Sequence, residues 1–482
     1  MRAASAFLIS FFSCYNTRND GGDSMQGKQE QDFTKGRISH TILRLALPMT
    51  LAQLINVLYN IVDRMYIGRL PHVASHALAG VGITFPIITI VIAFANLAGM
   101  GGAPLFSIAR GRKDHVYART IMGNSFTLLL LFGITLPILI LLFRHDLLYL
   151  FGASDTIYPY ADAYISIYLS GSVFVMISLG MNSFINEQGF AKTGMLTVAL
   201  GALVNIVLDP ILIFTLDMGV QGAAVATVLS QLVSAVWVLL FLTKSSPLTL
   251  KLSHMRLKLS LVRRILTLGL SGFVMSVTNG LVQIVCNATL QMVGGDLYIS
   301  VMTIINSLRE VITLPVSGIT NGSQPVMGYN YGAREYGRVR SCIRFMSIVC
   351  VLYMLVMWIV IVLTPSFFIR IFSADSSLLT IGIPAIQVYF FGYFMMAFQF
   401  SGQSTFVALN CSGYAIFFSL FRKAIIVVPL TLLLPQVYGL GVYGVFLAEP
   451  ISNFIGGGIC YLTMLLRVGR RLKTKEAASS SA

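Results

Sequence analysis

Residues 45–70 read LALPMTLAQLINVLYNIVDRMYIGRL, a long apolar stretch that ends beside an acid and a base. From Leu45 to Ile67 the only formal charges are Asp63 and Arg64. About 20 apolar residues are enough for a helix to cross the hydrocarbon layer of a bilayer. A charge inside such a span costs roughly 2.5–3.5 kcal/mol on insertion scales and usually has a function. The stretch therefore predicts a membrane-spanning helix with a functional polar end.

Apolar blocks of this kind recur along the whole chain. Of 482 residues, 56% are hydrophobic and 11% are charged, whereas a soluble domain carries about 25% charged residues. Period-2 alternation of the membrane-barrel type is absent, so we expect helices. The sequence predicts an all-α polytopic membrane protein with twelve transmembrane helices, at about 42–67, 77–103, 118–142, 161–186, 193–215, 219–242, 262–293, 298–325, 338–364, 380–408, 412–435 and 439–466.

The net charge of +15 is unevenly distributed. With an even number of spans both termini share one side. We place Arg64 and Arg309 within spans, and Arg69, Arg144 and Arg370 in loops on the opposite side. The remaining basic residues are assigned to the termini and loops of the first side. This positive-inside pattern predicts cytoplasmic termini in a bacterial inner membrane and contact with anionic lipids, and it requires no nucleic acid.

Residues 1–40 and the cysteines contribute little to the predicted fold. The apolar run AFLISFF is too short to span a membrane, and the polar residues that follow it are typical of disorder. We therefore predict a disordered N-terminal segment over 1–40, with Met25 as an alternative start. The six cysteines contain no CxxC pair and are interpreted as small apolar residues.

An internal repeat organises the rest of the chain. With a shift of 221, PLFSIARGRKDHVYAR (104–119) aligns with PVMGYNYGAREYGRVR (325–340), and with a shift of 222, GVQGAAVATVLSQ (219–231) aligns with GVYGVFLAEPISN (441–453). Each copy holds six spans, so the repeats are parallel and related by a pseudo-twofold axis along the membrane normal. The predicted parts are an N-lobe (41–242), a basic linker (243–262), a C-lobe (263–467) and a cytoplasmic tail (468–482).

This organisation favours transport over catalysis. Two similar six-helix lobes imply a cleft between them and alternating access by rocking. Neither a GxxxxGK[ST] loop nor an HExxH motif is present, so we expect no enzyme and no cofactor. The energy for pumping would then come from an ion gradient.

Polar residues form stripes inside several spans. In the first span Gln53, Asn56, Asn60 and Asp63 share one helical face. A shift of 223 leads to Ser276, Asn279, Gln283 and Cys286, so the second copy keeps the stripe without its acid. The asymmetry predicts that one lobe alone contains the ion-coupling site.

A second acid lies in the fifth span, in the sequence NIVLDP. Asn205 and Asp209 are four residues apart on one face, next to Pro210, and the sixth span adds Thr227. Two buried carboxylates with neutral oxygens can exchange a proton, because crowding and desolvation favour the neutral acid, or they can bind Na⁺. We therefore expect a cation-coupling site that contains Asp63, Asp209, Asn205, Thr227, Asn182 and Asn60, and the sequence leaves H⁺ and Na⁺ open. The structural alternatives are that Asp63 pairs with a base to join helices, and that Asn205, Thr227 and Asn182 serve as interhelical glue.

The second lobe has polar residues of its own. Glu310 shares a face of the eighth span with Asn306, Gln399 and Gln403 are four apart in the tenth span, and Glu449 precedes a proline in the twelfth. Carboxylates and amides among many Phe, Tyr and Met residues would suit bulky lipophilic cations. We therefore expect a substrate site that contains Glu310, Gln53, Asn56, Asn279, Gln283, Gln399, Gln403 and Glu449.

The sequences LALPMTLAQLINVLYNIVDRMYIGRL, NIVLDPILIF, GVQGAAVAT and QPVMGYNYGAREYGR resemble the multidrug and toxic compound extrusion (MATE) family. The resemblance covers about residues 38–470 and is strongest to the bacterial branch with the DinF-like and staphylococcal-type pumps. It implies twelve helices in two lobes and export of cationic drugs in exchange for Na⁺ or H⁺. By resemblance, Asp63 and Asp209 match the acids that bind the coupling ion, with Asn205 and Thr227 as companions. Glu310 resembles an acid of the substrate site.

Two rival functions remain open. A lipid-linked oligosaccharide flippase of the same superfamily would need several cationic residues that face the cleft, and counting only Arg64 and Arg309 inside the membrane favours the exporter. A membrane-bound enzyme or receptor is the third possibility. We expect a monomer that exports small lipophilic cations.

Overall fold

The computed structural model describes residues 30–70, 74–372, 376–437 and 439–480. Every secondary-structure element in these ranges is helical. Ten helices are long and apolar enough to cross a membrane, and two bent helix pairs bring the number of spans to twelve. The predicted all-α membrane protein with twelve transmembrane helices is confirmed.

The first half of the chain forms helices that follow the predicted blocks closely. They are α2 (Ile38–Ile67), α3 (Ala74–Gly111), α4 (His115–Leu142), α5 (Arg144–Leu150), α6 (Tyr158–Ser170), α7 (Ser172–Glu187), α8 (Ala191–Pro210) with the π-helical η1 (Ile211–Thr215), and α9 (Gly219–Leu240) with η2 (Phe241–Ser245). Pro210 lacks an amide hydrogen, and the helix continues beyond it with π-helical bonding. The acid Asp209 therefore precedes a local break in the α-helical pattern.

The second half repeats this order. A short η3 (Leu252–His254) precedes α10 (Leu259–Gly294), α11 (Asp296–Gly332), α12 (Tyr336–Leu363), α13 (Pro365–Phe372), α14 (Ser376–Tyr389), η4 (Tyr393–Met395), α15 (Met396–Ala408), α16 (Ser412–Leu420), η5 (Phe421–Val427), α17 (Val428–Leu433), η6 (Leu434–Gln436), α18 (Val442–Ser452), η7 (Asn453–Gly457), α19 (Gly458–Thr463), η8 (Met464–Gly469) and α20 (Arg470–Ser480). The segment predicted as a tail from residue 468 thus continues the last helix.

Matching backbone features support the internal repeat. Lys113 and Arg334, which the shift of 221 aligns, both have positive φ, at 59° and 65°. Gly171 and Gly392 are aligned by the same shift, and each lies where a span bends, by 56° in the first copy and 42° in the second. The repeat detected in the sequence therefore extends to the breaks in the helices.

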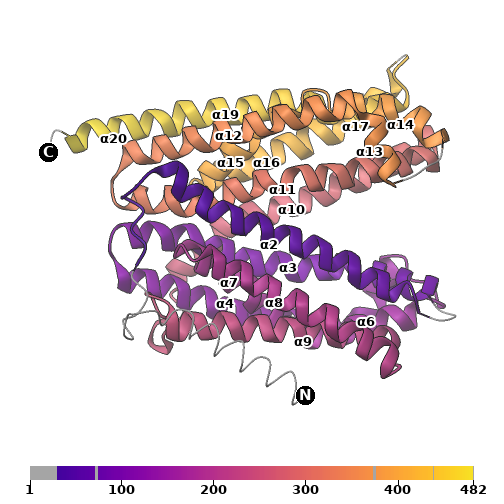
Figure 1. Ribbon diagram of the computed structural model, residues 1–482, viewed down its shortest axis with the longest axis horizontal. Coiled ribbons are helices and arrows are strands. Elements are labelled where there is room, and N and C mark those ends of the chain that lie inside the picture. Colours follow the sequence, from indigo (N-terminus) through magenta and orange to yellow (C-terminus); the bar gives the residue numbers. More distant parts are fainter. Residues whose placement is uncertain (1–29, 71–73, 373–375, 438, 481–482) are drawn as a thin grey trace.

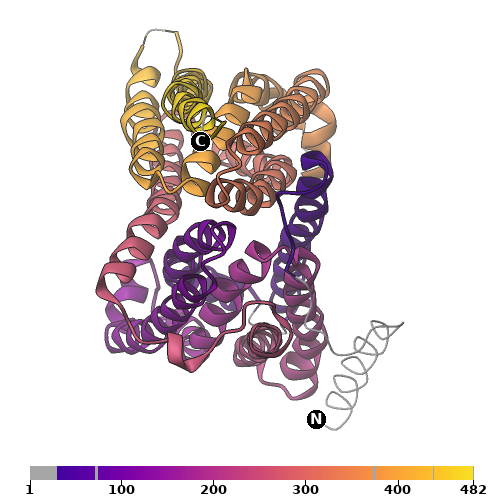
Figure 2. The ribbon, with the colours of Figure 1, turned by 90° about the vertical axis from the view of Figure 1, so that its left-hand side faces the viewer.

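The two halves of the chain form two helix bundles that lie side by side (Figures 1 and 2). We call the side on which α2 begins and α20 ends the terminal face, at the left of Figure 1. Helix α2 packs against both α8 and α11, and α10 packs against both α3 and α16. These helices make the contact between the bundles, which diverge toward the face opposite the termini (Figure 1).

Small residues bring the bundles together in the half of the molecule near the terminal face. A Cβ atom on Gly101 of α3 would collide with the backbone of α10 at Ile265 and Gly269, and one on Gly322 of α11 would lie 2.8 Å from the amide nitrogen of Ala46 in α2. Ser107 Oγ also donates a hydrogen bond to the Pro325 carbonyl of the other bundle, at 3.0 Å. The terminal face is therefore closed in this conformation.

Residues 30–37, the N-terminal strap, cross this closed face. Arg110 of α3 bonds to Glu30 at 3.1 Å and to the Gln31 carbonyl at 3.1 Å. On the other bundle, Asn330 Nδ2 and Arg338 Nη2 donate to the Phe33 carbonyl, each at 3.1 Å. The expected disorder through residue 40 therefore does not describe 30–40, since the strap packs on both bundles and α2 starts at Ile38. Residues 1–29, with the alternative start, lie outside the described ranges.

The linker between the lobes is also fixed to the protein. Asn124 of α4 accepts a hydrogen bond from the Lys258 amide at 2.8 Å and donates one to the Arg256 carbonyl at 3.1 Å. Thr127 Oγ1 donates to the Met255 carbonyl at 2.8 Å. Helix α10 begins at Leu259, four residues before the predicted boundary at 263.

Candidate functional site

The two N-lobe acids are brought together between α2 and α8. The carboxyl groups of Asp63 and Asp209 lie close enough to interact directly. Asn205, one turn before Asp209, donates to Asp209 Oδ1 at 3.3 Å, and both Asn205 and Asp209 are fully buried. Among the described residues, no partner bonds to Asp63 Oδ1, Asp209 Oδ2 or Asn205 Oδ1. The pair therefore presents buried acceptor oxygens that are not satisfied by the protein.

Aromatic and hydroxyl side chains surround this acid pair. Tyr59, one turn before Asp63 on α2, interacts with both carboxyl groups. Tyr164 of α6 interacts with Asp63 and contacts Thr227 of α9, which is itself buried. The predicted residues Asp63, Asp209, Asn205 and Thr227 thus share one environment, and Tyr59 and Tyr164 are additions that the polar stripe did not single out.

Arg64 does not neutralise the acid next to it in the sequence. Its guanidinium lies over the Phe85 ring of α3, 4.5 Å from the centroid. Asp63 has no ion pair with it among the described contacts. Unpaired oxygens and two carboxylates fit a proton or a hard monovalent cation such as Na⁺, which takes oxygen ligands. The described residues contain no group of three or more His, Cys, Asp or Glu that could bind a metal ion.

A central pocket of about 450 Å³ lies between the bundles. Its lining comes from α2, α3, α7, α8 and α11 and includes Gln53, Asn56, Asn182 and the acids Glu187 and Glu310. A second pocket of about 250 Å³ extends toward the C-lobe and includes Gln403. The two pockets share Gln53, Met100, Asn321 and Gln324. The described lining of both pockets contains no Lys or Arg, so each polar residue in it is either acidic or uncharged.

The structure places Asn182 far from the acid pair with which the sequence predicts it to bind the coupling ion. Asn182 donates to the Gly194 carbonyl at 3.2 Å, near the start of α8. Fifteen helical residues separate Gly194 from Asp209, which is roughly 22 Å along the axis. Asn182 therefore belongs to the central pocket. Asn60 donates to the Asn56 carbonyl through its amide nitrogen, at 2.7 Å, and because a cation would bind the amide oxygen, the ion-binding role of Asn60 stays a prediction.

The predicted amide residues of the C-lobe differ in their position relative to the two pockets, and of these only Gln403 lines one of them in the described residues. Gln399 is buried and donates to Gln403 Oε1 at 3.2 Å, so it lies one layer behind the second pocket. Asn279 is exposed on α10, and Gln283 bonds to Asn287 of the same helix at 3.5 Å. Neither Asn279 nor Gln283 is among the lining residues of the two pockets described above.

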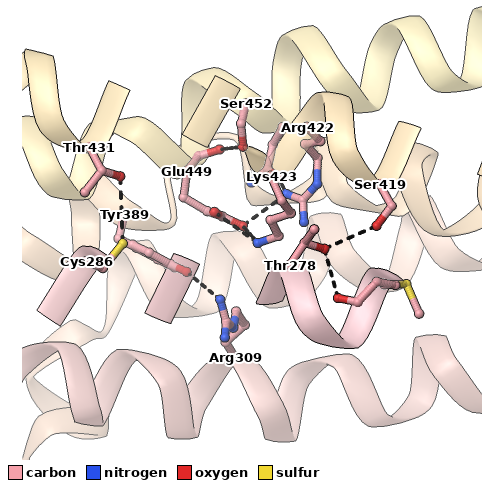
Figure 3. Close-up of polar contacts among 12 residues, drawn as sticks. Thr278, Cys286, Arg309, Tyr389, Ser419, Arg422, Lys423, Thr431, Glu449 and Ser452 are labelled. Atoms are coloured by element: carbon pink, nitrogen blue, oxygen red, sulfur yellow. Dashed lines mark hydrogen bonds and ion pairs between the residues drawn. The ribbon is translucent and has the colours of Figure 1, made fainter. Parts of the chain in front are cut away.

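Glu449 is not a substrate-facing carboxylate, contrary to the prediction. Figure 3 shows it inside the C-lobe, where Lys423 Nζ lies 3.1 Å and Arg422 Nη1 lies 3.0 Å from Glu449 Oε1. The interpretation that Arg64 and Arg309 are the only intramembrane cations is therefore wrong. Arg422 and Lys423 lie inside the predicted span 412–435, and both are buried.

The site of the second copy that corresponds to the acid pair is uncharged. Shifts of 223 and 222 align Asp63 with Cys286 and Asp209 with Thr431, and Cys286 Sγ lies 3.8 Å from Thr431 Oγ1. Thr227 aligns with Glu449, and Tyr168 aligns with Tyr389. The two lobes therefore build equivalent positions with different chemistry.

Sequence reasoning missed Glu187, Asn321 and Gln324 in the pocket. Glu187 lies one residue beyond the predicted block 161–186, at the end of α7, and its side chain is buried. A search that extended each block by one helical turn would have found it. Asn321 and Gln324 lie on one face of α11 after Ser317, so the stripe that contains Glu310 could have been followed further.

Two bundles with a central pocket and buried charged groups define a membrane transporter fold. A model of the MatE family matches residues 48–211 and 272–433, one segment in each bundle, and this chain therefore belongs to the MatE family. The multidrug export protein MepA of Staphylococcus saprophyticus is 25% identical over 445 residues, which is 91% of this chain and 97% of that protein. MepA of Staphylococcus aureus N315 is 23% identical over the same length.

Solved structures agree with the fold. A MATE crystal structure in a bent conformation has a TM-score of 0.87 at 24% identity and covers 92% of this chain and 98% of its own. A second structure, described as the outward-facing conformation of a multidrug resistance MATE family transporter, has a TM-score of 0.86 at 23% identity and covers 93% and 100%. The predicted family is confirmed, and the chain is a multi-pass membrane protein.

Proposed function

We propose that this protein is a cation-coupled antiporter that exports lipophilic, often cationic compounds by alternating access of its two lobes. The observation that carries the proposal is the acid pair Asp63 and Asp209, which has buried oxygens without a described partner, in a protein with a central pocket whose charged lining consists of Glu187 and Glu310. Intramembrane acids of this kind are functional as a rule. Relatives named as multidrug export proteins support the same substrate class.

Helix α2 connects the parts that such a cycle needs. It carries Asp63 near one end, Gln53 and Asn56 in the central pocket, and Ala46 against α11 at the closed terminal face. About 15 Å of continuous helix separates Asp63 from Gln53. Protonation or Na⁺ binding at the acid pair changes the charge at one end of α2, and a movement of this helix would reach both the pocket and the terminal closure. A drug cation and the coupling cation can then occupy the protein in alternation.

The flippase alternative is weakened by the position of the cations and not by their number. Arg309, Arg422 and Lys423 all lie within the C-lobe, but none of them lines either of the two pockets. A pyrophosphate-linked substrate would need cations that face the cleft. We therefore retain the exporter, with a bacterial inner membrane and cytoplasmic termini as its expected setting.

Dye efflux from proteoliposomes tests the proposal. Purified protein is reconstituted, a fluorescent lipophilic cation is loaded, and Na⁺ and pH gradients are imposed separately. We expect one of the two gradients to drive efflux, and Asp63→Asn and Asp209→Asn each to reduce it to the level of protein-free liposomes. Asp217→Asn, at an exposed position with positive φ that suits Asn, is the matched control. Full efflux by both acid-pair variants, or equilibration without any gradient, would contradict the proposal.

A further inference from the structure

The buried cluster of the C-lobe contains more positive than negative charge. Its cations are Arg309 of α11 and Arg422 and Lys423 of η5, and among the described residues its carboxylate is Glu449 of α18 (Figure 3). Arg422, Lys423 and Glu449 are 5%, 4% and 3% exposed. Arg309 has no described ion pair and donates only to the Tyr389 hydroxyl, at 3.1 Å. Burying more cations than anions is unfavourable unless a further anion compensates them.

Polar side chains at the cluster also lack acceptors. Asn453 is fully buried, and its Oδ1 accepts from Arg422 at 2.6 Å, but its Nδ2 has no partner among the described residues. The hydroxyl group of Tyr393, also fully buried, has no described partner although its ring lies near Arg309 and Glu449. An amide nitrogen and a phenol can both donate hydrogen bonds. The missing component is therefore an acceptor.

The local backbone is built around these side chains. Arg422 and Lys423 lie in the π-helical segment η5, and Asn453 begins the π-helical segment η7. Such segments are often found at functional sites. A Cβ atom on Gly456 would lie 2.7 Å from Arg422 Cγ, so glycine leaves the space that the arginine stem occupies. The cluster is thus packed in a specific geometry.

We propose that this cluster is an anion-binding site of the C-lobe for one small monovalent anion of the chloride class. Arg309, Lys423, Asn453 and Tyr393 would supply the positive charge and the donors, with Glu449 holding Lys423 and Arg422 in place. The anion must be small, because Lys423, Asn453 and Tyr393 are all buried and leave little room around them. Arg309 is half-buried, whereas Arg422 and Lys423 are buried, so Arg309 is the most accessible of the three cations of the cluster.

Equilibrium binding of radioactive chloride tests the site directly. The full chain, purified in detergent with gluconate as the only other anion, is titrated with ³⁶Cl⁻ in a scintillation proximity assay. We expect saturable binding that bromide displaces. Arg309→Gln removes a charged donor and should weaken binding about tenfold or more, and Tyr393→Phe, which removes only the hydroxyl, should weaken it severalfold. The readout needs no transport, so its failure is distinguishable from failure of the proposed efflux function.

The control is Arg64→Gln, which removes an intramembrane cation of the other lobe and should leave ³⁶Cl⁻ binding unchanged. All variants are compared only as monodisperse protein on size-exclusion chromatography, and Tyr393→Phe keeps the test meaningful if Arg309→Gln does not fold. Displacement by acetate at the concentration at which bromide acts would support an anion site that accepts a small carboxylate as well as a halide. Absence of saturable binding to the unmodified protein, or binding by Tyr393→Phe and Arg309→Gln that equals binding by the unmodified protein, would overturn the proposal.

Discussion

The N-terminal strap should stabilise the conformation in which the terminal face is closed. The Phe33 side chain is 2% exposed and lies between the two bundles. Its ring packs edge-on against Tyr329 of α11, with centroids 5.4 Å apart, and the Arg110 guanidinium of α3 lies 5.6 Å from its centroid. When the terminal face opens, α3 and α11 separate, and the ring can keep only one of these two contacts.

The size of the effect follows from the contact that is lost. An aromatic pair contributes about 0.5–1.5 kcal/mol, and a desolvated cation–π contact contributes about 0.5–2 kcal/mol. Phe33→Ala should therefore shift the equilibrium by about 1–2 kcal/mol toward the state with an open terminal face. A shift of that size changes the ratio of the two states by a factor of about 5–30.

Distance measurements between spin labels can detect this shift. Labels at Leu150 of α5 and Phe367 of α13 lie on exposed positions of the two bundles at the face opposite the termini, 76% and 61% exposed. In lipid nanodiscs, with the native cysteines replaced, we expect Phe33→Ala to increase the ratio of the short-distance to the long-distance population by that factor. Phe143→Ala, the same substitution at a side chain that is 52% exposed, should leave the distribution unchanged. An unaltered distribution in Phe33→Ala would refute a role of the strap in closure.

Other parts of the structure give further expectations. Glu449→Gln leaves two buried cations without a counter-charge and should lower the free energy of unfolding by about 3–5 kcal/mol, measured by thermal denaturation in detergent, and adding Lys423→Gln should recover part of the loss. Gly269→Ala places a methyl group against the α3 backbone and should open the terminal face in the spin-label assay, whereas Gly280→Ala, which has open space, should not. Asn124→Ala removes two part-buried hydrogen bonds to the linker, worth about 0.5–1.5 kcal/mol each, and should accelerate limited proteolysis between residues 246 and 258.

Most of the fold could be predicted because a bilayer imposes a length and an apolar composition on every span. The repeat added the relation between the halves, and glycines such as Gly171 and Gly392, which the repeat aligns, mark the two spans that bend. The strap could not be predicted in this way. Its polar composition is typical of disorder, and its order depends on Arg110 and Arg338, side chains distant in the sequence that bind its carbonyl groups.

The candidate site could be predicted only as far as single helices allow. Periodicity identifies which residues share a face of α2, but it does not identify the helix that this face contacts. Asp63 and Asp209 meet because α2 packs on α8, whereas Asn182 contacts the far end of the same α8. For Glu449, the sequence shows an acid among apolar neighbours but does not show what neutralises it. Its partner Lys423 lies 26 residues earlier, on another helical segment.

The difference in charge between equivalent sites restricts where the coupling cation can bind. In the N-lobe two carboxylates have oxygens that no described residue satisfies, so a cation can enter without displacing a protein group. In the C-lobe the thiol and hydroxyl of Cys286 and Thr431 replace the acid pair, and the ammonium group of Lys423 already occupies both oxygens of Glu449. A second cation there would have to displace Lys423 against the repulsion of Arg422. We therefore expect the cation cycle to be confined to the first bundle, while the second bundle, with its excess of buried positive charge, can only attract an anion.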